Sequence, residues 1–124
     1  MSKEDSIIAR ATSTNIHIEG EVSVKRRGYI HINIDLMTRL FIYQDSNQWN
    51  NNFVRALTDK DVDTVTTYVA NWPLDEAFEI PGNGLLHWQV QLKIGEDVLR
   101  YEGSRNSDAV WRHVTALIAD IGGK

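Results

Sequence analysis

Two segments in the first third of the chain alternate between apolar and polar residues. The first covers residues 15–24 and the second covers residues 28–36. Their apolar positions are Ile16, Ile18, Val22, Val24, Ile30, Ile32, Ile34 and Leu36. A period of two residues is typical of a β-strand that is buried on one side only. Two such strands separated by a short connection predict a β-hairpin.

The register of this hairpin follows from the rule that residues directly opposite one another share a face of the sheet. If the apolar sets meet, Val24 should lie opposite Ile30, with residues 26–28 forming the loop. Gly28 would then supply the left-handed backbone position that a three-residue loop requires.

The segments on either side of this hairpin are less clearly patterned. Residues 39–43 alternate like a third strand, but the preceding turn lacks glycine and proline, so they could instead continue the second strand. Residues 7–11 are compatible with an edge strand or with a short helix. Residues 44–52 are rich in Gln, Asp, Ser and Asn around a single aromatic residue, Trp49, which indicates a loop.

A helix is predicted over residues 59–71. Thr58 is a suitable N-cap, and Asp61 follows it at the position of a capping box. The apolar stripe at helical spacing consists of Val62, Val65, Val69 and Trp72. Pro73 prevents the helix from continuing.

A second hairpin is predicted in the last third of the chain. Residues 86–94 show the strongest alternation, and a turn at 95–97 leads to a short strand over 98–102. Matching the apolar faces would put Leu99 opposite Ile94.

A terminal helix should follow the second hairpin, capped by Asn106 or Ser107. Its apolar stripe consists of Val110, Val114, Leu117, Ile118 and Ile121, and Trp111 lies beside it. The order of elements is two or three strands, a helix, two strands and a helix. It predicts a two-layer α+β domain in which helices pack on one face of an antiparallel sheet built from two hairpins.

The length of 124 residues predicts a single domain over residues 1–124. The absence of cysteine excludes disulfides and zinc–thiolate sites. A net charge of −4, from 13 basic and 17 acidic residues, argues against general nucleic-acid binding. Since no segment approaches the roughly 18 apolar residues of a membrane span, we expect no membrane association and a cytoplasmic location.

Catalytic, metal and cofactor sites are not expected, because the residues form no signature for them. The predicted register separates His17 from His31 by six strand positions, about 20 Å, while His87 and His113 lie in other elements. The same register would place Glu19 opposite Asp35, a close carboxylate pair of the kind that can raise a pKa in an active site. A slipped register or ordinary solvation is the simpler interpretation of this pair.

Binding residues are more plausible than catalytic ones. Trp49 combines a rigid aromatic ring with neighbouring asparagine amides, as binding loops do, although it could equally pin its own loop. The candidate partner-binding residues are Trp49, Asn50, Asn51, Glu19, Glu21 and Asp35. They predict a small acidic protein-binding module, such as an inhibitor, immunity factor or adaptor, that occupies a partner with a basic surface. Exposed strand edges would also allow a homodimer.

Two other hypotheses remain open from the sequence. A small-molecule-binding protein or enzyme could have a pocket between the sheet and the helices, lined by Trp72, Trp88, Tyr101 and Trp111. Nucleic acid could contact Lys25, Arg26 and Arg27 at the tip of the first hairpin, but the overall negative charge opposes this.

Overall fold

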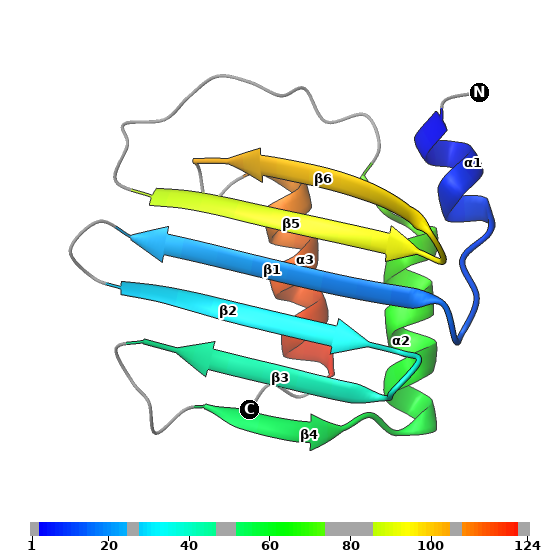
Figure 1. The fold of residues 1–124 in the computed structure, drawn as a ribbon, viewed down its shortest axis with the longest axis horizontal. Coiled ribbons are helices and arrows are strands. Elements are labelled where there is room, and N and C mark those ends of the chain that lie inside the picture. Colours follow the sequence, from blue (N-terminus) through cyan, green and yellow to red (C-terminus); the bar gives the residue numbers. More distant parts are fainter. Residues whose placement is uncertain (1–2, 25–27, 47–51, 74–85, 105–107, 122–124) are drawn as a thin grey trace.

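The computed structural model describes residues 3–24, 28–46, 52–73, 86–104 and 108–121. Its strands are β1 (Ile16–Val24), β2 (Gly28–Asp35), β3 (Leu40–Asp45), β4 (Phe53–Ala56), β5 (Leu86–Ile94) and β6 (Asp97–Gly103), and its helices are α1 (Lys3–Ala9), α2 (Asp59–Ala70) and α3 (Ala109–Asp120). The strands form one antiparallel sheet in the order β4-β3-β2-β1-β5-β6 (Figure 1). The predicted α+β class is therefore confirmed.

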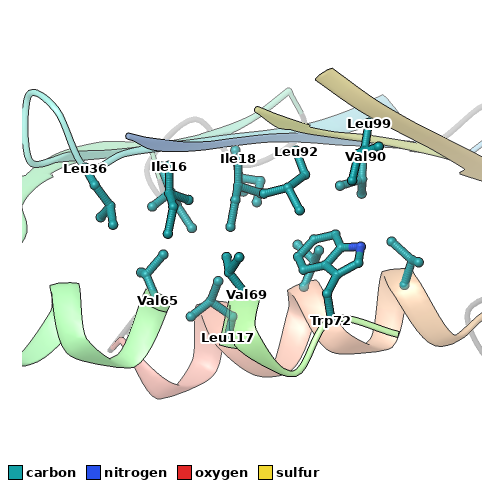
Figure 2. Packing of buried hydrophobic residues seen from close by; sticks show 14 of the residues in the cluster. Ile16, Ile18, Leu36, Val65, Val69, Trp72, Val90, Leu92, Leu99 and Leu117 are labelled. Carbon is teal, nitrogen blue, oxygen red and sulfur yellow. The ribbon is translucent and has the colours of Figure 1, made fainter. Parts of the chain in front are cut away.

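Helices α2 and α3 lie behind the same face of the sheet, whereas no described segment covers the opposite face (Figure 1). We call this opposite face the open face. Figure 2 shows apolar side chains of the sheet pointing toward those of the two helices. The apolar positions predicted for the two helices lie in this core, since Val65 and Val69 of α2 and Val114 and Leu117 of α3 are all fully buried. The helices thus take up the apolar face of the sheet and leave its polar face available.

The first hairpin has a different register from the one that the sequence predicts, although its connection still has three residues. Val22 pairs with Ile30, and Val24 pairs with Gly28, so the expected pairing of Val24 with Ile30 is wrong by two residues. The connecting residues 25–27 lie outside the described part of the chain. Gly28 has the predicted positive φ, of 100°, but it is the first residue of β2 and not part of the loop as predicted. Because the slip is an even number of residues, every side chain keeps its predicted face.

The second hairpin shows the same deviation. Leu99 pairs with Leu92 rather than with Ile94, which instead pairs with Asp97. The turn therefore contains two residues, and Gly95 at its first position has a φ of 62°. Two-residue turns with positive φ match the right-handed twist of the flanking strands, which explains why the tighter register is adopted.

Residues after the first hairpin form a separate strand, β3, rather than a continuation of β2. The turn between them needs neither glycine nor proline, because Arg39 takes the left-handed conformation with a φ of 60°. The carboxylate of Asp35 also accepts a hydrogen bond from the Met37 amide at 2.9 Å. Aspartate is a common turn residue because its side chain can accept a hydrogen bond from the backbone two residues later, and Asp35 does so here in a turn without glycine or proline.

Two further elements complete the fold. The N-terminal segment is helical, so the choice between strand and helix is settled in favour of α1. Strand β4 was not predicted, because its four residues are too few to show a period, and it pairs with β3 at one edge of the sheet.

Helix α2 has the predicted capping box: Thr58 and Asp61 each accept a hydrogen bond from the backbone of the other. Helix α3 differs from the prediction, because its N-cap is Asp108, whereas Asn106 and Ser107 lie outside the described residues. The Asp108 carboxylate instead accepts a hydrogen bond from the indole of Trp88 at 2.8 Å.

Acid should weaken the fold partly through Asp61. Burial raises the pKa of this carboxyl, but hydrogen bonds from Thr58 and Arg55 outweigh burial and hold the pKa below its ordinary value. A carboxylate with a depressed pKa in the folded state stabilises the protein above its ordinary pKa and loses that contribution as the pH falls through the folded value.

The expected result is that Asp61→Asn flattens the loss of stability below about pH 4. Urea unfolding at a series of pH values would measure this, with the exposed Asp63→Asn as the control. Equal acid dependence of the wild type and Asp61→Asn would contradict the assignment.

Candidate functional site

The open face is hollowed across four neighbouring strands, β2, β1, β5 and β6. We call this hollow the acidic trough; its volume is about 420 Å³. Its lining residues are Glu19, Gly20, Glu21, His31, Gln89, Val90, Gln91, Arg100, Tyr101 and Glu102. The trough lies over the centre of the sheet, on the side that α2 and α3 leave uncovered.

Strand register explains the shape of the trough. Two rows of outward side chains cross the strands: Glu19, Gln91 and Arg100 form one row, and Glu21, Gln89 and Glu102 form the other. The row between them consists of Gly20, Val90 and Tyr101. These three residues are buried toward the helices, so the trough has polar walls above a floor of sheet backbone.

Gly20 allows the core to pack closely beneath this floor. A Cβ atom at this position would lie 3.2 Å from Cγ1 of Ile32 and 3.7 Å from the Trp111 ring. The first distance is tighter than ordinary van der Waals contact. Glycine therefore allows the Ile32 side chain to approach the backbone of the central strand.

Negative charge predominates in the trough, which contains three carboxylates and one guanidinium. The Glu19 carboxylate accepts a hydrogen bond from Nε2 of His31 at 3.1 Å, and the Glu102 carboxylate lies 3.5 Å from Nε2 of His87. Glu21 is exposed and has no hydrogen-bond or ion-pair partner among the described residues. The free carboxylate makes the trough a favourable place for a cationic group.

The structure brings two of the predicted binding residues together. Glu19 and Glu21 both line the trough from β1. Asp35 lies on the same face but does not line the trough, and its carboxylate is engaged by the Met37 amide. We therefore assign Asp35 a role in the turn. Trp49, Asn50 and Asn51 lie outside the described residues.

The predicted pairing of Glu19 with Asp35 is wrong. The observed register puts Glu19 opposite Asn33 and Asp35 opposite His17. Its physical cause is the register shift of two residues in the first hairpin. The two carboxylates consequently form no close pair of the kind that would point to acid–base catalysis.

The histidines are held by separate partners. His17 hydrogen-bonds Asn33 at 2.9 Å. Glu21 lies opposite His31, so His17 and His31 are separated by four positions along the strands rather than the predicted six. His113 is half-buried rather than on the surface, with its Nε2 2.6 Å from the Tyr68 carbonyl oxygen. Within the described ranges, no three His, Asp or Glu side chains gather closely enough to hold a metal ion.

The outward trough residues of the second hairpin were all missed as site residues: Gln89, Gln91, Arg100 and Glu102. The alternation in the second hairpin already indicated that Gln89 and Gln91 face outward. Their relation to Glu19 and Glu21 depends on β1 pairing with β5, which are more than sixty residues apart at their closest pair. A local pattern contains no information on that long-range pairing.

The aromatic residues of the alternative hypothesis pack in the core. Trp88 and Trp111 stack with ring centroids 6.0 Å apart, and Trp72 lies 6.0 Å from Tyr101. All four are at most 8% exposed. Their rings thus contact one another in the space where the alternative hypothesis puts a pocket, whereas the acidic trough lies on the other side of the sheet.

None of the three described helices is long and apolar enough to span a bilayer. No protein-family model matches this chain, and no curated protein matches it either.

Proposed function

We propose that this protein is a binding module that occupies the surface of a partner protein through the acidic trough, as an inhibitor, immunity factor or adaptor does. One observation supports this proposal above the others: Glu19, Glu21 and Glu102 converge on an uncovered sheet face against a single guanidinium, that of Arg100. Lysine and arginine side chains of a partner are the protein groups that complement such a surface.

The arrangement suits recognition by charge. Glu21 forms no hydrogen bond or ion pair with a described residue, so binding would break no such contact of its carboxylate. The Glu19 carboxylate is oriented by its hydrogen bond with His31. Because these groups are partly exposed, each ion pair adds little affinity by itself. Together they should accelerate association and select partners with a basic surface, and both effects weaken as salt is added.

The asparagine-rich segment around Trp49 is also part of this proposal. It begins shortly after Gln44, whose side chain lies 3.4 Å from His31 of the trough. At its base, the amide of Asp45 donates a hydrogen bond to Asn52 at 2.6 Å. The chain therefore leaves β3 beside the trough, and we retain Trp49, Asn50 and Asn51 as proposed contacts.

Charge reversal in the trough tests the proposal. The tagged protein is used to capture partners from the cells that produce it, and the affinity of the purified partner is then measured at two salt concentrations. We expect Glu19→Lys/Glu21→Lys to weaken the complex about 100-fold, because facing like charges cost several kcal/mol. The wild-type affinity should also fall with increasing salt.

The matched control is Asp63→Lys/Glu96→Lys, which makes the same change in net charge. Asp63 is exposed on α2 and Glu96 is exposed in the β5–β6 turn, both away from the trough. This variant should bind like the wild type. Equal weakening by the two double variants, or a protein that never binds a macromolecular partner, would refute the proposed function.

A further inference from the structure

The open face has an apolar part beside the acidic trough. Outward residues of β3 and β4 form a cluster that we call the apolar patch: Leu40, Ile42 and Val54. Val54 is 65% exposed, Leu40 is 37% exposed and Ile42 is half-buried. Several large apolar side chains gathered at one end of a polar surface are typical of an interaction site.

Register connects the apolar patch to the trough. One cross-strand row runs from Val54 on β4 through Ile42 and Asn33 to Glu19 on β1. Along this row the surface changes from apolar to neutral polar to acidic. Neighbouring strands are about 4.8 Å apart, so Ile42 and Glu19 are separated by about 10 Å across the strands.

The sheet constrains what can lie along this row. Backbone groups of the central strands are already paired with neighbouring strands, so a segment crossing the face must satisfy its own backbone hydrogen bonds. An α-helix does so, whereas an extended segment does not. Two helical turns advance about 10.8 Å, which matches the separation between the apolar and acidic positions.

From this match, we propose that the docking segment of the partner is an amphipathic α-helix lying across the strands, with an apolar residue over Ile42 and Val54 and a lysine or arginine seven residues later over Glu19. The inference rests on the proposed function and specifies the partner. Its basis is charge complementarity at the trough together with the adjoining apolar patch.

Synthetic peptides provide the probe. A stapled helix of about 14 residues spans about 21 Å, enough to cross from β4 to β5, and carries two leucines followed seven residues later by two lysines. A second peptide has the same composition with leucines and lysines on opposite faces. Binding to the full-length protein is measured by NMR from the backbone amides of Ile42, Val54, Glu19 and Gln91.

The expected result is saturable binding of the first peptide that shifts the signals of both the apolar patch and the trough, with the second peptide at least tenfold weaker. Equal binding of both peptides, or shifts confined to the trough, would overturn the helix inference and leave the proposed function standing. A folded protein that binds neither lysine peptide would count against both.

A single apolar substitution provides an independent readout. Val54→Gln should weaken the first peptide about tenfold, since it removes the burial of one branched aliphatic side chain. Val98→Gln is the matched control, because Val98 is 38% exposed on β6, at the opposite edge of the sheet. Unchanged binding by a folded Val54→Gln variant would overturn the inference.

Discussion

Replacing Trp88 with alanine is expected to lower the free energy of unfolding by about 3–5 kcal/mol. Trp88 is fully buried on β5, stacks on Trp111 and donates its indole N–H to Asp108. Truncation would leave a large cavity and remove the hydrogen bond that ties β5 to the start of α3. A loss of this size is a large part of the 5–15 kcal/mol that stabilises a typical domain.

Urea unfolding followed by circular dichroism measures this loss. Trp88→Phe should be intermediate, because it retains an aromatic ring but leaves the Asp108 carboxylate without its indole donor. The exposed Val98→Ala is the control and should change stability by less than about 1 kcal/mol. A Trp88→Ala variant as stable as this control would show that the core is not packed as described.

The second large effect is expected at Arg55, which joins three elements. Its guanidinium donates to the Asp61 carboxylate of α2 at 3.1 Å and to the backbone carbonyl of Ile121, directly after α3. The Asp61 side chain is only 13% exposed. Removing the guanidinium leaves a largely buried carboxylate and a carbonyl without this donor, so Arg55→Ala should cost about 2–3 kcal/mol.

The control for Arg55 is a second arginine–aspartate pair. Arg39 and Asp59 are in close contact at 2.6 Å, but their side chains are 49% and 91% exposed. Solvent and salt screen such a pair, so Arg39→Ala should cost less than about 1 kcal/mol. Thermal unfolding of both variants measures the difference, and equal destabilisation would contradict the role assigned to Arg55.

Strand faces could be predicted from the sequence, whereas strand register could not. Val24 and Leu99 both keep their predicted faces, yet each pairs two residues away from its expected partner. A period of two leaves registers that differ by two residues equally compatible with the apolar pattern. Turn geometry decides between them. The first connection keeps three residues but comprises residues 25–27 instead of 26–28, whereas the second turn has two residues instead of the expected three.

The candidate site was predicted only in part for a related reason. Glu19 and Glu21 could be recognised from the sequence, because both lie on the polar face of one strand and the alternation of apolar and polar residues in that strand is visible over a short segment. Arg100 and Glu102 join them through the pairing of β1 with β5, which brings distant segments together. The hydrogen bond from the Met37 amide to Asp35 also could not be predicted, because it depends on side-chain geometry; the expected contact of Asp35 with a partner stays a prediction.

Photo-crosslinking from inside the acidic trough tests the central claim most directly. The photoreactive residue benzoylphenylalanine is introduced at Gln91, on a wall of the trough, and separately at Asp63 on the exposed side of α2. After irradiation in the cells that produce the protein, mass spectrometry identifies the adducts. We expect one partner to crosslink from Gln91 and not from Asp63, and the adduct to disappear when Glu19→Lys/Glu21→Lys is added. A partner that crosslinks from Asp63 but never from Gln91 would contradict the claim that the open face is the binding surface.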